Sequence, residues 1–354
     1  MSPEMARHRA ALRLAFAATL ALVWGTMARE PLPGLTAVVA AQILVATPRP
    51  PRPRQAVALV AVIAATGGAV FAVSAVFADR LLILTAALGL LFFLGFAMRE
   101  RAAGRPSLPA TMLLNATAVV PVLTFQAEIL GAGVLETLVS AAVRAALVVW
   151  LLYALFPAPR EEAATDAPAG DARATEMHVA EHRGAARTLA KVAIVLPAQL
   201  FYLAEPTALA FPALLGLVTF LTAQDPAAGR VQLVILLLGN LVGSVAAAGA
   251  SAVLEVGPPL PALTLMALLG SLGFTGWIMR PGRPGRAVAL TGLVTFLMLF
   301  GLAASLTQFD VPVLDRIADI FVLSLYTIGS TALLLPPPGP RVPAAIVSGS
   351  AQIS

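Results

Sequence analysis

Long uncharged runs, separated by short clusters of charged residues, constrain this chain more than any other feature. A helix that spans a bilayer needs about 20 apolar residues, and most of the runs reach that length, although the second and eighth are expected to be short or tilted. We therefore predict an all-α polytopic membrane protein with about twelve transmembrane helices. The twelve runs are Leu14–Ala28, Pro31–Pro48, Gln55–Ala78, Leu81–Met98, Pro106–Ala127, Thr137–Pro159, Val192–Ala204, Pro206–Gln224, Val231–Leu254, Val256–Met279, Ala287–Phe309 and Ile320–Pro340.

The composition excludes a soluble enzyme. Charged residues make up 12% of the 354 residues and hydrophobic residues 59%, whereas a soluble domain carries about 25% charged residues. The chain has no cysteine, and its three histidines, His8, His178 and His182, lie outside the apolar runs. We therefore expect no metal site and no cofactor. The net charge of +5 comes from arginines that flank the runs, which is typical of membrane topology rather than of nucleic-acid binding.

Short motifs recur in the same order in both halves of the chain, between 174 and 179 residues apart. These matches predict two copies of a six-helix unit in residues 1–156 and 184–335, in the same orientation in the membrane. Residues 157–183 and 336–354, rich in Ala, Pro and polar residues, are expected to be a disordered cytoplasmic linker and a flexible cytoplasmic tail. The matching motifs are His8-Arg9-Ala10-Ala11-Leu12-Arg13 with His182-Arg183-Gly184-Ala185-Ala186-Arg187, Glu30-Pro31 with Glu205-Pro206, Leu94-Gly95-Phe96 with Leu272-Gly273-Phe274, Gly104-Arg105-Pro106 with Gly282-Arg283-Pro284, Leu135-Glu136 with Leu314-Asp315, and Pro157 with Pro336.

The placement of basic residues predicts the orientation. Of the 23 Lys and Arg residues, all except Arg29, Arg80, Arg316 and Arg144 fall in segments on one side of the predicted spans. Lys and Arg are enriched in cytoplasmic loops. Both termini are therefore expected in the cytoplasm.

Arg144 interrupts the sixth run about halfway along its helix. An arginine there costs roughly 2.5–3.5 kcal/mol on insertion scales, so it should face a cavity or a partner. Two interpretations stay open, namely capture of an anionic substrate and a structural ion pair between helices. Glu136 lies two turns before Arg144 on the same helix face, and Asp315 and Asp319 occupy matching positions in the second copy, where the twelfth helix is expected to meet the sixth.

Asp319 is the expected partner of Arg144. Asp319, Asp315 and Glu136 are candidates for coupling transport to protons, since a carboxylate within the membrane can exchange a proton. The alternative is that the two aspartates only cap the outer end of a helix. Asn115 and Asn240 lie within apolar runs and are candidate substrate-binding residues. Their alternative role is hydrogen bonding between helices.

A unit with this order of features resembles the fusaric acid resistance and aromatic acid exporter superfamily, in particular its compact members without a cytoplasmic domain. The features are the basic amphipathic start at His8-Arg9-Ala10-Ala11-Leu12-Arg13, a Pro-bearing hairpin, and a short helix that ends at Thr47-Pro48-Arg49. The resemblance implies an efflux component of the bacterial inner membrane, driven by the proton gradient and exporting aromatic or other organic acids. It also implies a periplasmic adaptor protein as a partner, and a homo-oligomer stays open.

Two other functions remain alternatives to a proton-coupled exporter. A major-facilitator transporter also has two parallel six-helix halves, but the segment Arg49-Pro50-Pro51-Arg52-Pro53-Arg54 lacks the Asp-Arg-x-Gly-Arg type of motif typical of that loop. A non-transporting assembly subunit would equally explain how few charges lie within the runs. An enzyme and a nucleic-acid partner are not expected.

Overall fold

The computed structural model describes residues 3–46, 50–102, 107–125, 133–157, 180–204, 211–222, 226–255, 260–279, 285–304 and 313–334. Within these ranges the chain forms helices and no strand, and one helix overlaps each of the twelve predicted runs. The helices are α1 (Pro3–Met27), α2 (Pro33–Ala46), α3 (Pro53–Val76), α4 (Leu81–Arg101), α5 (Leu108–Phe125), α7 (Val134–Leu155), α8 (Ala180–Ala204), α9 (Phe211–Thr222), α10 (Pro226–Glu255), α11 (Leu260–Ile278), α12 (Arg286–Ala304) and α13 (Val313–Leu334).

The described helices differ in length more than the runs do. Eight of them are long and apolar enough to cross a bilayer, which makes the chain a multi-pass membrane protein. By contrast, α2 has 14 residues and the described α9 has 12. At 1.5 Å per residue they measure about 21 Å and 18 Å, short of a hydrocarbon core of about 30 Å. The expectation of short helices here is met, and twelve full spans do not follow from the described helices.

Two predicted boundaries differ from the structure. Helix α1 begins at Pro3, well before the first apolar run, because its polar first turns continue the same helix. Helix α8 begins at Ala180, inside the segment predicted to be a disordered linker. Most of that linker, and the tail after residue 335, lie outside the described residues.

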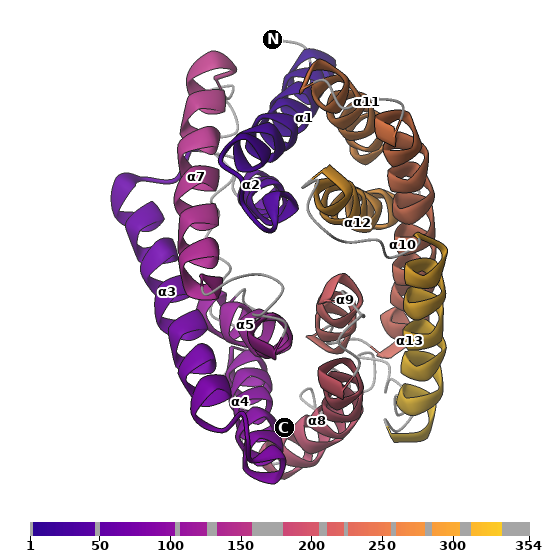
Figure 1. Cartoon of the computed structure of the whole chain (residues 1–354). Helices are drawn as coiled ribbons and strands as arrows, with labels where there is room; N and C mark the ends of the chain where they lie inside the picture. Colours follow the sequence, from indigo (N-terminus) through magenta and orange to yellow (C-terminus); the bar gives the residue numbers. More distant parts are fainter. Residues whose placement is uncertain are drawn as a thin grey trace, which may run out of the picture.

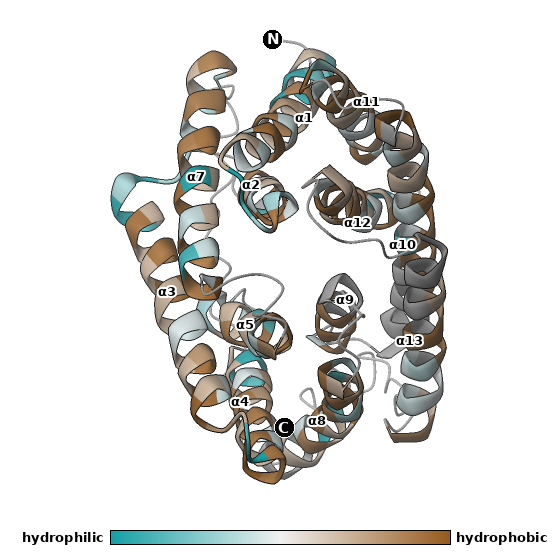
Figure 2. Ribbon diagram, in the orientation of Figure 1, coloured by the Kyte–Doolittle hydropathy of each residue, from teal (hydrophilic) through white to brown (hydrophobic). Residues whose placement is uncertain are grey.

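The helices form an elongated ring (Figure 1), with α2, α12, α5 and α9 toward its inside. Among these inner helices α2 contacts α12, α5 contacts α9, and α12 also contacts α9. Figure 2 shows apolar residues along the described helices, with few hydrophilic ones. Many large apolar side chains face outward, among them Val57, Leu82 and Leu90, which are 67%, 86% and 67% exposed. Such a surface is expected where lipid is the solvent.

The packing of the helices follows the same order in both halves. Helix α1 contacts α2, α7 and α11, and α8 contacts α9, α13 and α4. Likewise, α3 contacts α5 and α7, while α10 contacts α12 and α13. Each of these contacts has a counterpart in the other half when the helices are paired in chain order. The pairs are α1 with α8, α2 with α9, α3 with α10, α4 with α11, α5 with α12 and α7 with α13.

The backbones of α2 and α12 approach each other closely. A Cβ added to Gly301 would lie 2.6 Å from the backbone nitrogen of Gly34, and one added to Gly34 would lie 2.4 Å from the carbonyl oxygen of Leu297. Real Cβ atoms do not come so close to backbone. Glycine is therefore required on both helices, because only a residue without a side chain lets two helices approach this closely.

Candidate functional site

Arg144 lies near the midpoint of the 22-residue helix α7. Its side chain is 25% exposed, and its Nη1 forms an ion pair with Oε1 of Glu30, whose own side chain is 5% exposed. Glu30 belongs to the connection between α1 and α2, so the pair joins this connection to the middle of α7. A charge at such a position is expected to find a partner, because lipid cannot solvate it.

The connection between α1 and α2 is a tight turn that holds Glu30 in place. The Glu30 N–H donates to the carbonyl oxygen of Gly25 at 2.9 Å, and the Arg29 N–H donates to that of Thr26 at 3.0 Å. Arg29 itself has φ +55°, a left-handed conformation that ends α1 abruptly. Thr36, fully buried on α2, donates its hydroxyl to Oε2 of Glu30 at 2.9 Å.

Gly25 provides the space for the carboxylate. A Cβ on Gly25 would lie 2.7 Å from Oε2 of Glu30 and 2.9 Å from Cα of Pro33. The two carboxylate oxygens therefore have different neighbours, since Oε1 meets Arg144 while Oε2 meets Thr36 and the backbone at Gly25. Any larger residue at position 25 would push the carboxylate away from its hydroxyl donor.

The described ion pair engages only part of the Arg144 guanidinium. A guanidinium carries five N–H donors, and the described contact with Glu30 involves Nη1 alone. A quarter of the side chain is exposed. Donors of the guanidinium therefore lie outside the described contact with Glu30.

The partner of Arg144 differs from the one predicted. Helices α7 and α13 lie on opposite sides of the ring (Figure 1) and pack against different helices, so the expected meeting of the sixth and twelfth helices is wrong. The backbones of Asp315 and Asp319 belong to α13, while their side chains lie outside the described residues. Glu30 was not among the residues predicted to form the site. The shortness of the second run was the signal that this connection could lie beside the middle of another helix.

The other predicted site residues are spread over the fold. Glu136 is exposed in the first turn of α7, about 12 Å from Arg144 along the helix axis. A negative charge at this end of a helix interacts favourably with the helix dipole. Asn240 on α10 is buried, and its Oδ1 accepts a hydrogen bond from Thr295 of α12 at 2.6 Å. This contact supports the structural alternative for Asn240. Asn115 is half-buried on α5, a helix that contacts α7.

A second ion pair joins the two halves of the chain. Nζ of Lys191 on α8 lies 2.9 Å from Oε1 of Glu100 on α4, and Thr188 donates to Oε2 of Glu100 at 2.9 Å. The Lys191 side chain is 4% exposed and that of Glu100 is 23% exposed. The ammonium also lies 5.6 Å from the centre of the Phe96 ring. The cluster fastens α4 to α8.

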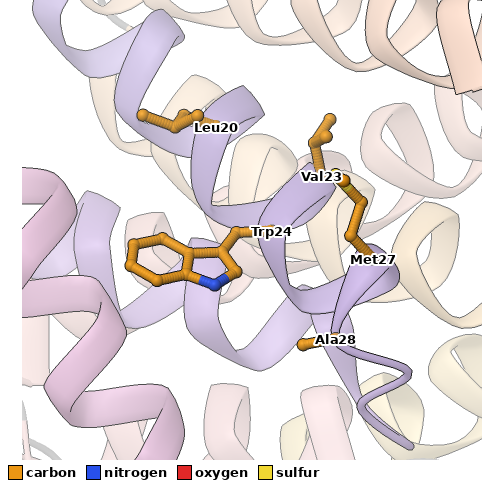
Figure 3. Close-up of a pocket in the computed structure, with 5 residues that line it drawn as sticks. All are labelled: Leu20, Val23, Trp24, Met27 and Ala28. Atoms are coloured by element: carbon orange, nitrogen blue, oxygen red, sulfur yellow. The ribbon is translucent and has the colours of Figure 1, made fainter.

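An apolar pocket of about 360 Å³ lies along the C-terminal end of α1, just before the turn that contains Glu30. Figure 3 shows the side chains that line it, with the Trp24 ring and the Val23 and Met27 side chains directed to different sides of the helix. Trp24 precedes Gly25, the residue against which the Glu30 carboxylate packs. The lining residues are Leu20, Val23, Trp24, Met27 and Ala28.

These features define a helical multi-pass membrane protein with an ion pair at the middle of one apolar helix. Residues 10–155 match a family described as a protein of unknown function, DUF2955. The matched segment contains both Glu30 and Arg144 and ends before the second half. No curated protein and no solved structure matches the chain.

Proposed function

We propose that this protein is a proton-coupled membrane transporter that exports small organic anions. The single observation that supports this most directly is the pairing of Arg144, partly exposed at the midpoint of α7, with the buried carboxylate of Glu30. Ionisable residues within membrane helices commonly mark the path of a substrate or a proton.

In the proposed mechanism, substrate and proton bind to the pair together, the substrate at Arg144 and the proton at Glu30. When the substrate carboxylate binds Arg144, it replaces Glu30 as the counter-ion, and Glu30 then takes up a proton. When the substrate leaves, Glu30 releases the proton and pairs with Arg144 again. The site therefore never holds an uncompensated charge, which would be costly in lipid. Thr36 and Gly25 keep the carboxylate within reach of the guanidinium in both states.

In this proposal Glu30, rather than the predicted Asp315 and Asp319, is the residue that couples transport to protons. Of the carboxylates whose side chains the structure describes, Glu30 is the one that contacts Arg144. Glu136 is exposed and about two turns away, so it suits a role in attracting or releasing protons at the mouth of the site. Asp315 and Asp319 remain candidates for the equivalent place in the second half.

We further propose that the chain is a duplicated six-helix unit with about twelve membrane helices. The collinear motifs and the matching order of helix contacts in the two halves support this proposal. The basic clusters support a cytoplasmic location for both termini. The resemblance to the fusaric acid resistance and aromatic acid exporter superfamily supports the bacterial inner membrane as the location, aromatic acids as substrates and a periplasmic adaptor as a partner.

Transport by the purified protein tests the proposal. We would reconstitute it in liposomes and measure uptake of phthalate, benzoate and salicylate under an imposed pH gradient. Phthalate is the most informative probe, because its two charges slow passage through lipid. We expect saturable uptake that depends on the gradient, is lost in Arg144→Met and is partly kept in Arg144→Lys. Wild-type rates in Arg144→Met, or no saturable uptake of any of the three acids, would overturn the proposal.

A further inference from the structure

The two halves of the chain meet at opposite ends of the ring (Figure 1). At one end α1 contacts α11 and α2 contacts α12, and we call these contacts the α1–α11 seam. At the other end α8 contacts α4 and α9 contacts α5, and we call these contacts the α4–α8 seam. Under the helix pairing given above, each seam is the counterpart of the other. A duplicated chain by itself predicts two equivalent seams.

The α4–α8 seam contains the charged cluster of Glu100, Thr188 and Lys191. Nζ of Lys191 lies 2.9 Å from one oxygen of the Glu100 carboxylate, and Thr188 donates to the other oxygen at 2.9 Å. Thr188 is 1% exposed, and the Lys191 side chain is 4% exposed. The described contact between these two helices is therefore polar at this point.

The corresponding residues of the α1–α11 seam are apolar. The motifs directly before them align α1 with α8 at an offset of 174, and the motifs on either side of Glu100 both align α4 with α11 at an offset of 178. The counterparts of Thr188, Lys191 and Glu100 are Leu14, Ala17 and Ile278. All three counterparts are at most 2% exposed and belong to one apolar cluster. One seam thus has an ion pair where the other has dry packing.

The inner helices of the two seams differ as well. In the α1–α11 seam, Gly301 on α12 lies against the backbone of Gly34 on α2. The neighbouring motifs, with offsets of 178 and 179, give Gly301 the counterpart Leu123 or Val122 on α5. Neither residue lets a neighbouring backbone approach as closely as glycine does. The α1–α11 seam therefore combines backbone contact with apolar packing, and the α4–α8 seam lacks this glycine.

These differences make the two seams unequal in the free energy needed to separate them. Exposing apolar surface to water costs free energy in proportion to its area. Separating an ion pair into water costs less, because water solvates both charges and offsets the lost attraction. Glu100 is the last residue but one of α4, and its side chain is 23% exposed. Water therefore reaches this pair as soon as the two helices begin to part.

We infer that α4 and α8 separate during transport while the α1–α11 seam stays closed. This inference rests on the proposed function, since a transporter must expose its site to the two sides of the membrane in turn. The ion pair of Lys191 with Glu100 breaks in the open state and forms again on closure. The close contact of α2 with α12 is the hinge about which the two halves move.

Distances between spin labels test this inference directly. The chain has no cysteine, so introduced cysteines are labelled uniquely. Labels at Leu94→Cys and Leu189→Cys report on α4 and α8, where these residues are 48% and 58% exposed. The control labels, at Phe16→Cys and Leu269→Cys, report on α1 and α11, where these residues are 38% and 53% exposed. In liposomes, saturating phthalate should add a longer distance for the first pair and leave the control pair unchanged.

A transplanted seam provides a second test. The triple variant Glu100→Ile, Thr188→Leu and Lys191→Ala gives the α4–α8 seam the residues of its counterpart. We expect an unfolding temperature at least equal to that of the wild type, since apolar replacement of a buried pair is often neutral or stabilising. Phthalate uptake should be roughly tenfold slower, which corresponds to a barrier higher by about 1.4 kcal/mol. The control Leu14→Ile with Ile278→Leu keeps volume and polarity and should keep wild-type uptake.

The outcomes separate this inference from the proposed function. The inference alone is overturned if the wild type transports phthalate but the distance between α4 and α8 does not change, or if the control pair changes instead. Wild-type uptake by a folded triple variant overturns it too, and if that variant does not fold, the spin-label distances decide. Absence of saturable uptake by the wild type overturns the proposed function, and this inference with it.

Discussion

Substituting Arg144 and substituting Glu30 should lower the free energy of unfolding by different amounts. In Arg144→Met the Glu30 carboxylate, 5% exposed, keeps only the Thr36 hydroxyl as a described hydrogen-bond donor. Removing one partner of a fully buried pair costs about 3–5 kcal/mol. Because Arg144 is a quarter exposed, we expect the lower end, about 3 kcal/mol. In Glu30→Gln the guanidinium can turn to its exposed side, and the cost should be about 1–2 kcal/mol.

The double variant Arg144→Met with Glu30→Gln tests whether the two losses come from one interaction. It contains no uncompensated charge, so it should be more stable than Arg144→Met alone. The coupling free energy of a direct contact is typically 0.5–3 kcal/mol, and we expect about 2 kcal/mol here. Unfolding by SDS, followed by tryptophan fluorescence, measures all four proteins under the same conditions. Losses that simply add would show that the side chains do not interact and would refute the proposed site.

Three further predictions concern packing and the second ion pair. Gly25→Val should lower the unfolding temperature and abolish phthalate transport, because a Cβ there would lie 2.7 Å from the carboxylate; Gly273→Val, which meets nothing within 4 Å, should leave both unchanged. Glu100→Gln should destabilise more than Lys191→Met, because it leaves the more deeply buried charge unpaired; the opposite order in a thermal unfolding assay would contradict this reasoning. Gly301→Leu should prevent folding, measured as loss of the monodisperse peak in size-exclusion chromatography, because the new side chain would collide with the backbone of α2; a monodisperse, stable variant would show that α2 and α12 are not in close contact.

The positions of the helices follow largely from local sequence. Each predicted run is overlapped by one helix, because an uncharged apolar stretch in a membrane must satisfy its backbone hydrogen bonds within itself. The start of α1 at Pro3 could not be read from hydropathy, since polar residues extend the helix beyond the apolar run. The prominence of Arg144 also follows from sequence alone, because a charge in an apolar run is conspicuous whatever the fold.

The partner of Arg144 could not be predicted in the same way. The sequence offered several carboxylates near the ends of runs, and the comparison of the two halves favoured Asp319. The structure instead brings Glu30 to Arg144, because a short α2 and the tight turn after Met27 place this connection beside α7. Nothing in the local sequence of Glu30 distinguishes it from an exposed loop residue.

The sequence by itself determined that this chain is a bundle of lipid-embedded helices and that a guanidinium lies within one of them. Both properties depend on hydrophobicity summed over neighbouring residues, which any fold must respect. The tertiary structure alone decided which carboxylate neutralises that guanidinium and which asparagine is engaged between helices. Those outcomes depend on the placement of side chains from helices far apart in the chain, because hydrogen bonds and ion pairs form only over a few ångströms.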